Sequence, residues 1–270
     1  ILYIDLPSMF LAGQNKDVVI RYAGKPHIAK RAPWDGGFVW QKTESGKDWI
    51  ATAIQGEGCD LLWPCIDHPT AEPEAVDIKI EVPADLVAAS NGRLINVINK
   101  DATKIYHWRS TVAQNNYAIS LNIGPYELLQ KQHISRFGNS VDLQYYYLPE
   151  HEGKAQILFD EFAPMLDFFE HVVGPYPFAE DKMGVVDTPH LGMEHQTINA
   201  YGNGFKIDQY GFDWLLQHEF AHEWFGNQIT NHDWNHMWLH ESFATFMQPL
   251  YVQYLYGDMA YMAYMYKIRQ

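Results

Sequence analysis

The chain has 270 residues, of which 47% are apolar and 19% charged, and it carries a formal net charge of −14. This length and balance are sufficient for one or two globular domains with buried cores and exclude a disordered chain. The excess of 33 acidic over 19 basic residues excludes a nucleic-acid-binding surface built on Lys and Arg, and no apolar run approaches the ~20 residues of a transmembrane helix.

The first half of the sequence is typical of short strands separated by turns. Residues 76–82 alternate polar and apolar side chains and end at Pro83, as a strand with one buried face does. Further strands are predicted at 18–22, 104–109, 117–123 and 141–148, with turns containing Gly, Asn or Pro between them. Many short strands indicate an antiparallel sandwich or a saddle-shaped sheet.

Helical spacing replaces this pattern beyond residue 150. Across 154–173 apolar residues recur every three or four positions, and Pro164 should kink this helix or mark its start. A short strand at 183–186 is then followed by two helices, at about 213–225 and 238–256, the first of them ended by Gly226. We expect an α+β chain with two domains, an antiparallel β domain at 1–150 and a second domain at 151–270.

The two cysteines, Cys59 and Cys65, have no histidine at the spacing of a zinc knuckle beside them. We interpret them as free thiols, with a single local disulfide as the alternative, so the redox compartment stays open. No signal peptide is present at the first residues of the sequence, but a signal peptide that was removed together with a missing amino-terminal segment would leave the same sequence. We expect a soluble protein, either cytoplasmic or periplasmic or secreted.

A cluster of His and Glu residues lies in the first of the two late helices. His218 and His222 are four positions apart, so both imidazoles share one helix face and can reach the same ion. Glu219 flanks that ion and suits a general base acting on a metal-bound water. Catalytic zinc typically has three protein ligands and one open position. The next helix offers Glu241 as the third ligand, or His240 as the alternative.

This cluster resembles the zinc signature of a known family. Residues 218–227, followed by Trp238-Leu239-His240-Glu241, are similar to the signature of the aminopeptidase N family, which contains leukotriene hydrolase and whose catalytic domain resembles thermolysin. The resemblance implies that Glu241, and not His240, is the third zinc ligand. It also implies that 1–150 form the family's amino-terminal β domain and 151–270 the first part of its thermolysin-like catalytic domain.

A second motif, Gly192-Met193-Glu194-His195, resembles the family's Gly-Ala-Met-Glu-Asn exopeptidase motif. The resemblance implies that Glu194 binds the free α-amine of the substrate and that Gly192 and Met193 lie against the substrate backbone. Leu191 replaces the usual first Gly and His195 the usual Asn. His195 is therefore either a substrate contact or an incidental histidine.

The resemblance extends over nearly the whole chain. Residues 63–69 and 90–92 are similar to landmarks of the family's β domain, and residues 173–178 resemble the entry to its catalytic domain. Gln55 matches a Gln or Glu that helps to hold the substrate amine in relatives, although Ala53 stands where a Gln is usual.

The implied activity is that of a zinc-dependent aminopeptidase acting on peptides with a free N-terminus. One zinc ion polarises the scissile carbonyl and activates water, Glu219 moves the proton, and Glu194 admits only a chain end. The tyrosine that stabilises the oxyanion in relatives is expected beyond residue 270. We therefore expect a fragment that lacks a carboxy-terminal part, binds zinc and by itself hydrolyses peptides weakly or not at all.

Three alternatives stay open. A leukotriene-hydrolase-like enzyme would share these ligands and add epoxide hydrolysis. A non-catalytic scaffold of the same fold would have no need of the ligands, the base and the amine anchor together. A thermolysin-like endopeptidase would cleave an N-acetylated peptide, which an amine anchor at Glu194 blocks. The sequence does not determine the preferred first residue or the oligomeric state.

Overall fold

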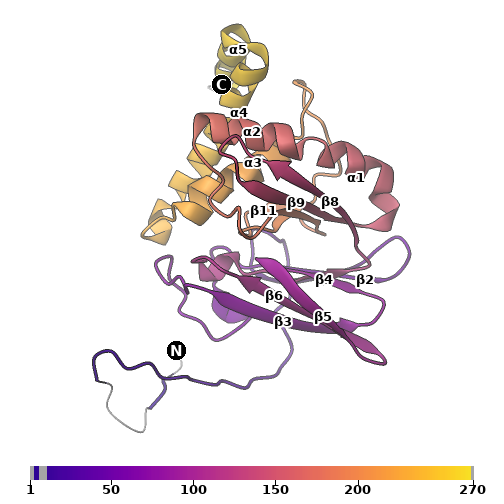
Figure 1. Ribbon diagram of the computed structural model, residues 1–270, viewed down its shortest axis with the longest axis vertical. Helices are drawn as coiled ribbons and strands as arrows, with labels where there is room; N and C mark the ends of the chain where they lie inside the picture. The colour runs from indigo at the N-terminus through magenta and orange to yellow at the C-terminus, as the bar shows by residue number, and fades with distance from the viewer. Residues whose placement is uncertain (1–2, 6–10, 269–270) are drawn as a thin grey trace.

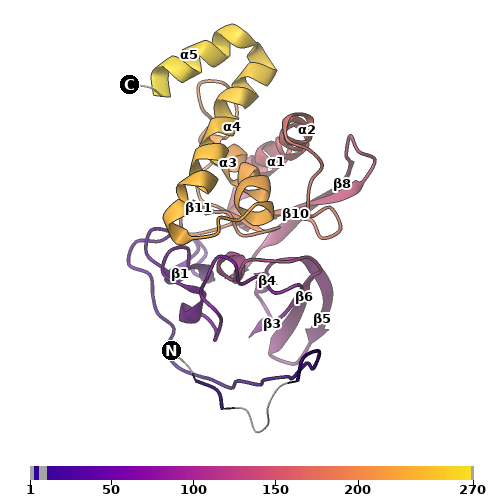
Figure 2. The same ribbon diagram turned by 90° about the vertical axis from the view of Figure 1, so that its left-hand side faces the viewer.

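Strands gather at one end of the molecule and helices at the other, and the chain runs from the first end to the second (Figure 1). The structure is a computed structural model that describes residues 3–5 and 11–268. An extended segment passes along the outside of the strand-rich end before the first strand begins (Figure 2). None of the described helices is both long enough and apolar enough to cross a membrane.

The strand-rich end contains two antiparallel sheets, with strand orders β1-β2-β7-β4 and β3-β6-β5. Alternation explains the buried face of β3, where Ile80 and Val82 pack with Trp108 of β6 in one core. The bounds are Gly37–Lys42 for β1, Asp48–Ala53 for β2, Val76–Pro83 for β3, Val87–Ala89 for β4, Arg93–Asn99 for β5, Thr103–Ser110 for β6 and Asn122–Gly124 for β7.

The strand predictions at 76–82, 104–109 and 141–148 are confirmed, and the other two need correction. Residues 18–22 are extended but pair with no described strand. The prediction at 117–123 is right only at its end, because residues Asn116–Ala118 form a 3-10 turn. The side chain of Asn115 accepts a hydrogen bond from the backbone N–H of Tyr117 at 3.1 Å, and this cap stabilises the turn against an extended conformation.

A mixed five-stranded sheet of order β11-β12-β10-β9-β8 begins the second part of the molecule. Its strands are β8 Glu127–Ile134, β9 Ser140–Tyr147, β10 Met183–Asp187, β11 Gly192–Met193 and β12 Asn199–Tyr201. Both β9 and β12 run parallel to β10, and the other pairs are antiparallel. Strands β8 and β9 precede the predicted domain boundary near residue 150, but they belong to the same sheet as strands that follow it, and β9 pairs with β10. The division into two domains at residue 150 stays a prediction.

Helices pack on this sheet and enclose the main core. Their bounds are Glu152–Phe159 for α1, Phe162–Val172 for α2, Trp214–His222 for α3, Trp238–Tyr256 for α4 and Asp258–Ile268 for α5. The helix predicted at 154–173 is two helices, and Pro164 lies in the first turn of α2, where its missing N–H is tolerated. Phe162 of α2, Phe220 of α3 and Met183 of β10 meet in the core. The predicted α+β class is confirmed.

A buried turn at Ser90-Asn91-Gly92 joins the two parts of the molecule. Asn91 Nδ2 donates to the carbonyl oxygens of Ala118 at 2.8 Å and Gln196 at 2.7 Å. The backbone N–H of Gly92 donates to Thr197 Oγ1 at 2.8 Å. Gly92 has φ +73°, and a Cβ there would overlap the backbone of the neighbouring strand, so glycine is required. The turn therefore fixes the segment that follows Glu194.

The interpretation of Cys59 and Cys65 as free thiols is wrong, because the structure joins them in a disulfide. The 3-10 turn Cys59–Leu61 folds the chain back, which leaves the two Cα atoms 6.2 Å apart, within reach of a disulfide. Cys59 is fully buried in a small core with Ile54 and Tyr117. The disulfide thus braces the strand end that carries Gln55.

The buried carboxylate of Asp187, at the end of β10, accepts a hydrogen bond from His151 Nδ1 at 2.8 Å. This hydrogen bond raises the pKa of His151 above its ordinary value of 6.5. Because the pKa of His151 is higher in the folded state than in the unfolded chain, the interaction contributes its full stabilisation at pH values below the unfolded-state pKa of 6.5. This stabilisation is lost as the pH rises through the pKa of His151 in the folded state. We expect His151→Gln to lower the melting temperature more at about pH 5.5 than at about pH 8.5. An equal decrease at both pH values, measured by circular dichroism, would contradict this assignment.

Candidate functional site

Helix α3 begins at a fixed residue because Asp213 caps it. Asp213 Oδ1 accepts from the backbone N–H groups of Leu215 at 3.0 Å and Leu216 at 3.1 Å, which satisfies donors that the first helical turn leaves unpaired. Phe220 then faces the main core. The opposite face of α3 consequently lines a cleft of about 460 Å³ between the two parts of the molecule.

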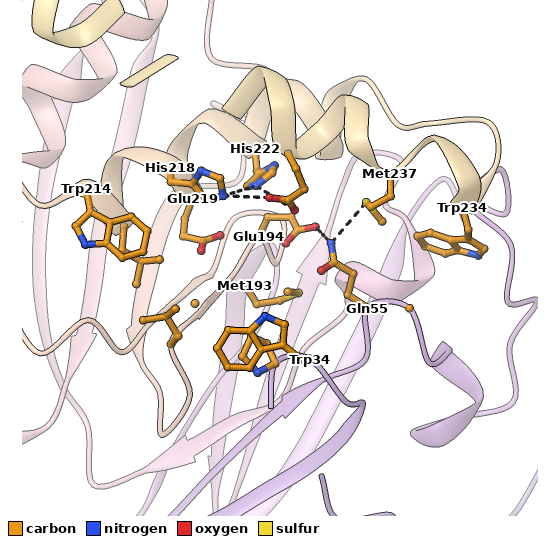
Figure 3. A pocket seen from close by; sticks show the side chains of 16 residues that line it. Trp34, Gln55, Met193, Glu194, Trp214, His218, Glu219, His222, Trp234 and Met237 are labelled. Atoms are coloured by element: carbon orange, nitrogen blue, oxygen red, sulfur yellow. Dashed lines mark hydrogen bonds and ion pairs between the residues drawn. The ribbon is translucent and has the colours of Figure 1, made fainter. Parts of the chain in front are cut away.

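Three ligand atoms converge at this cleft (Figure 3). The Nε2 atoms of His218 and His222 are 3.1 Å apart. Glu241, from the first turn of α4, places Oε2 at 3.3 Å from His218 Nε2 and Oε1 at 3.8 Å from His222 Nε2. The structure thus brings together the three residues that the sequence proposes as metal ligands.

The chemistry of this donor set fits a divalent cation. His222 Nδ1 donates to the carbonyl oxygen of Phe225 at 3.0 Å, which directs the lone pair of Nε2 toward the cleft. Burial lowers the pKa of His222 to about 3, so the ring is neutral. Burial raises the pKa of Glu241, but the hydrogen bond with His218 and the neighbouring imidazole rings outweigh it, and the net shift is downward. Two imidazoles and one carboxylate match the ligand set of a catalytic zinc site.

His240, the alternative third ligand, lies outside this set. Its Nε2 accepts a hydrogen bond from the backbone N–H of Asn231 at 2.8 Å. The ring is buried and does not line the cleft. Its lone pair is therefore used by the backbone, which favours Glu241 as the ligand.

Glu219 lies deep in the cleft, almost completely buried. Burial, followed by the charges of Glu194 and Glu241, raises its pKa well above the ordinary value. The carboxylate rests on Gly192 of β11, where a Cβ atom would overlap Glu219 Oε1. A side chain at this position would displace the Glu219 carboxylate, so glycine leaves room for it.

Glu194 is buried beside Glu219 and is held from the other part of the molecule. Its Oε1 accepts from the hydroxyl of Tyr117 at 3.0 Å and from the side-chain amide of Gln55. Burial, followed by the charge of Glu241, raises the pKa of Glu194. The two residues proposed to bind an amine, Gln55 and Glu194, are thus in direct contact, although 139 positions separate them in the sequence.

The segment that carries Glu194 is fixed to α3 as well. Glu223, one residue after His222, accepts from the backbone N–H of Thr197 at 2.9 Å and from Asn199 Nδ2 at 2.7 Å. The neighbouring His195 is fully buried and does not line the cleft. Its ring nitrogens have no partner among the described residues, and burial lowers its pKa to about 3.

The sequence motifs assign no function to several residues that line the cleft. Trp34 lies on the side opposite the two histidines, and Trp214, Trp234 and Met237 line the remaining walls (Figure 3). Tyr117, which does not line the cleft but donates a hydrogen bond to Glu194, is predicted from the sequence only as part of a strand. Trp234 and Met237 lie seven and four positions before Glu241, and this proximity in the sequence is a signal that could have indicated them. No local pattern points to Trp34 or Tyr117, since both come from distant segments.

Comparisons with known proteins agree with this geometry. Residues 159–270 match the Peptidase family M1 domain. Over 256 residues the chain is 28% identical to endoplasmic reticulum aminopeptidase 1 of Homo sapiens, covering 90% of this chain and 26% of that protein. It is 27% identical over 224 residues to tricorn protease-interacting factor F2 of Thermoplasma acidophilum, covering 78% of this chain and 27% of the relative. The chain therefore spans about a quarter of the length of these curated relatives.

Solved structures show the same fold. The M1 zinc metallopeptidase of Deinococcus radiodurans superposes with a TM-score of 0.67 at 26% identity, covering 85% of this chain and 51% of that one. A mutant of a two-domain M1 zinc metallopeptidase bound to L-arginine gives a TM-score of 0.72 at 25% identity, covering 91% and 55%. A mutant of the Deinococcus radiodurans enzyme bound to a Tyr-Ser-Ala substrate gives 0.69 at 26% identity, covering 85% and 51%.

Proposed function

We propose that this chain, which belongs to the aminopeptidase N family of peptidase M1 enzymes, carries the zinc site and the amine site of an aminopeptidase. The single observation that carries the proposal is the contact between Gln55 and Glu194 inside the cleft that His218 and His222 also line. A buried carboxylate at this place favours a substrate with a positively charged end.

We assign His218, His222 and Glu241 as the residues that would hold one zinc ion. The convergence of their ligand atoms within 4.8 Å of one another supports this assignment. The M1 enzymes of similar structure are named zinc metallopeptidases, which supports the choice of metal. Zinc, when bound there, supplies a Lewis acid that polarises a carbonyl oxygen and makes water more acidic.

The remaining chemistry falls to side chains of this chain. Glu219 would accept the proton of the attacking water and return it to the leaving amine. Glu194 would bind the ammonium group of the first residue, with Gln55 beside it. Because that anchor lies next to Glu219, the first peptide bond is the one presented for hydrolysis.

The substrate backbone would lie along β11. Gly192 and Met193 pair with β12 along one edge, so the other edge of this short strand remains available for a peptide. The proposed substrates are therefore peptides with a free N-terminus bound in extended conformation. The activity is assigned to the full-length protein of which this chain forms a part.

The test uses full-length protein and a panel of aminoacyl fluorogenic substrates. A chelator should lower the rate by ~100-fold or more, and added zinc should restore it, because the polarising cation is removed and returned. The same peptides with an acetylated N-terminus should resist cleavage. Activity that survives complete metal removal, verified by elemental analysis, would contradict the proposal.

Two variants test which histidines bind zinc. His222→Ala should lose bound zinc and activity, whereas His240→Ala should retain zinc because His240 Nε2 is bound to the backbone of Asn231. Loss of zinc from the second variant alone would reassign the third ligand.

A further inference from the structure

The two side chains that hold Glu194 both reach the same oxygen atom. The Tyr117 hydroxyl donates to Glu194 Oε1 at 3.0 Å, and Gln55 Nε2 donates to that atom as well. Among the described residues, Tyr117 and Gln55 are the side chains that donate to this carboxylate. Oε2 is therefore not needed to fix the side chain and is left for the ammonium group of a substrate.

Tyr117 is itself held rigidly. It is 1% exposed and lies in the 3-10 turn Asn116–Ala118, and its own backbone N–H donates to the side chain of Asn115. Its ring packs with Ile54 and the disulfide-bonded Cys59. It also makes an edge contact with Trp234 of the cleft wall, with ring centroids 5.3 Å apart. The hydroxyl therefore has a fixed position to which the flexible Glu194 side chain adapts.

Glu194 needs this support because other carboxylates and potential metal ligands lie close to its side chain. Ligand atoms of Glu194, Glu219 and His222 all lie within 4.8 Å of one another. A glutamate side chain has three rotatable bonds, so an unsupported Glu194 could turn toward His222 and a cation bound there. The hydrogen bonds that Tyr117 and Gln55 donate to Oε1 oppose this rotation.

We propose that Tyr117 is a positioning residue that holds Glu194 in the orientation that binds the substrate amine. This inference rests on the proposed aminopeptidase function. Tyr117 does not line the cleft itself, so it acts through Glu194. It belongs to the strand-rich part of the molecule, whereas Glu194 and the metal ligands belong to the other part, so the amine site depends on the packing of the two parts.

The test is Tyr117→Phe in the full-length protein, which removes the hydroxyl and keeps the ring packing. We expect KM for substrates with a free amine to rise about 10-fold, equivalent to about 1.4 kcal/mol, with kcat changed less than about 3-fold. The affinity for a free L-amino acid, measured by calorimetry, should fall by a similar factor. Zinc content should not change.

Tyr126→Phe is the matched control. Tyr126 is also buried in the strand-rich part, and its hydroxyl donates to the carbonyl oxygen of Asp187 at 2.9 Å, without contact to Glu194. Its loss should lower the melting temperature and leave KM unchanged. A KM for Tyr117→Phe within about 2-fold of the wild-type value, or an equal rise for Tyr126→Phe, would overturn the inference.

A double-mutant cycle with Gln55→Ala tests the shared oxygen. If both donors restrain the same atom, the double variant should lose more affinity than the product of the single effects, because only then is the carboxylate free to rotate. Independent effects would overturn the shared restraint. A wild-type protein that neither cleaves free-amine substrates nor binds amino acids would overturn the proposed function together with this inference. An active, chelator-sensitive wild type with an unaffected Tyr117→Phe variant would overturn the inference alone.

Discussion

Replacing Glu219 by Gln should lower kcat of the full-length protein by about 1,000-fold while leaving bound zinc in place. The amide is isosteric with the carboxyl group and keeps the contact with Gly192, but it cannot accept and return a proton. Glu219 lies outside the ligand triad of His218, His222 and Glu241, so its loss should not release the metal. The measurements are steady-state kinetics on a free-amine substrate and zinc content by elemental analysis.

Glu223→Gln provides the control for removing a buried negative charge from the same segment. Glu223 is as deeply buried as Glu219, and its Oε1 accepts hydrogen bonds from Thr197 and Asn199, which a glutamine oxygen can also accept. We expect this variant to lose less than about 10-fold in kcat. Activity of Glu219→Gln within the same range as the control would remove Glu219 from the role of general base.

The parts of the site that could be predicted from the sequence are those in which the residues lie only a few positions apart. His218 and His222 share a helix face because they are four positions apart, and that relation holds in any helix. The bounds of α4, Trp238–Tyr256, agree with the prediction because its apolar pattern is long and ends at Gly257. The roles of Glu241 and Glu194 came from resemblance to a family, since spacing alone does not reveal which acid of a distant segment faces the ion.

The parts that it missed depend on contacts between distant segments. The hydroxyl of Tyr117 meets Glu194 77 positions away, and no local periodicity reports such a contact. Residues 18–22 have the composition of a strand but pair with no described strand. The β propensity of a residue depends on how its side chain packs against a neighbouring strand, so composition alone does not show whether such a neighbour exists. The Cys59–Cys65 disulfide depends on the intervening turn, which brings the two Cα atoms within bonding range.

Glu194→Gln should convert the amine site from a charged anchor to a neutral one and abolish the preference for a free N-terminus. Removing one partner of a buried, hydrogen-bonded charge pair costs about 2–5 kcal/mol, so kcat/KM for free-amine peptides should fall by at least about 30-fold. The amide keeps an oxygen that can accept from Tyr117 and Gln55, so the side chain should stay in place. The loss should therefore arise from the charge and not from altered packing.

The decisive comparison pairs each free peptide with its N-acetylated form in both proteins. Acetylation removes the positive charge from the substrate, as Glu194→Gln removes the negative charge from the enzyme. If the two groups interact directly, the variant should lose little further activity on the acetylated peptide, and the two changes together should be far from additive. Additive effects would mean that Glu194 acts elsewhere. Efficient cleavage of the acetylated peptide by the wild type would indicate an endopeptidase, because a carboxylate that required a chain-end ammonium group would prevent that reaction.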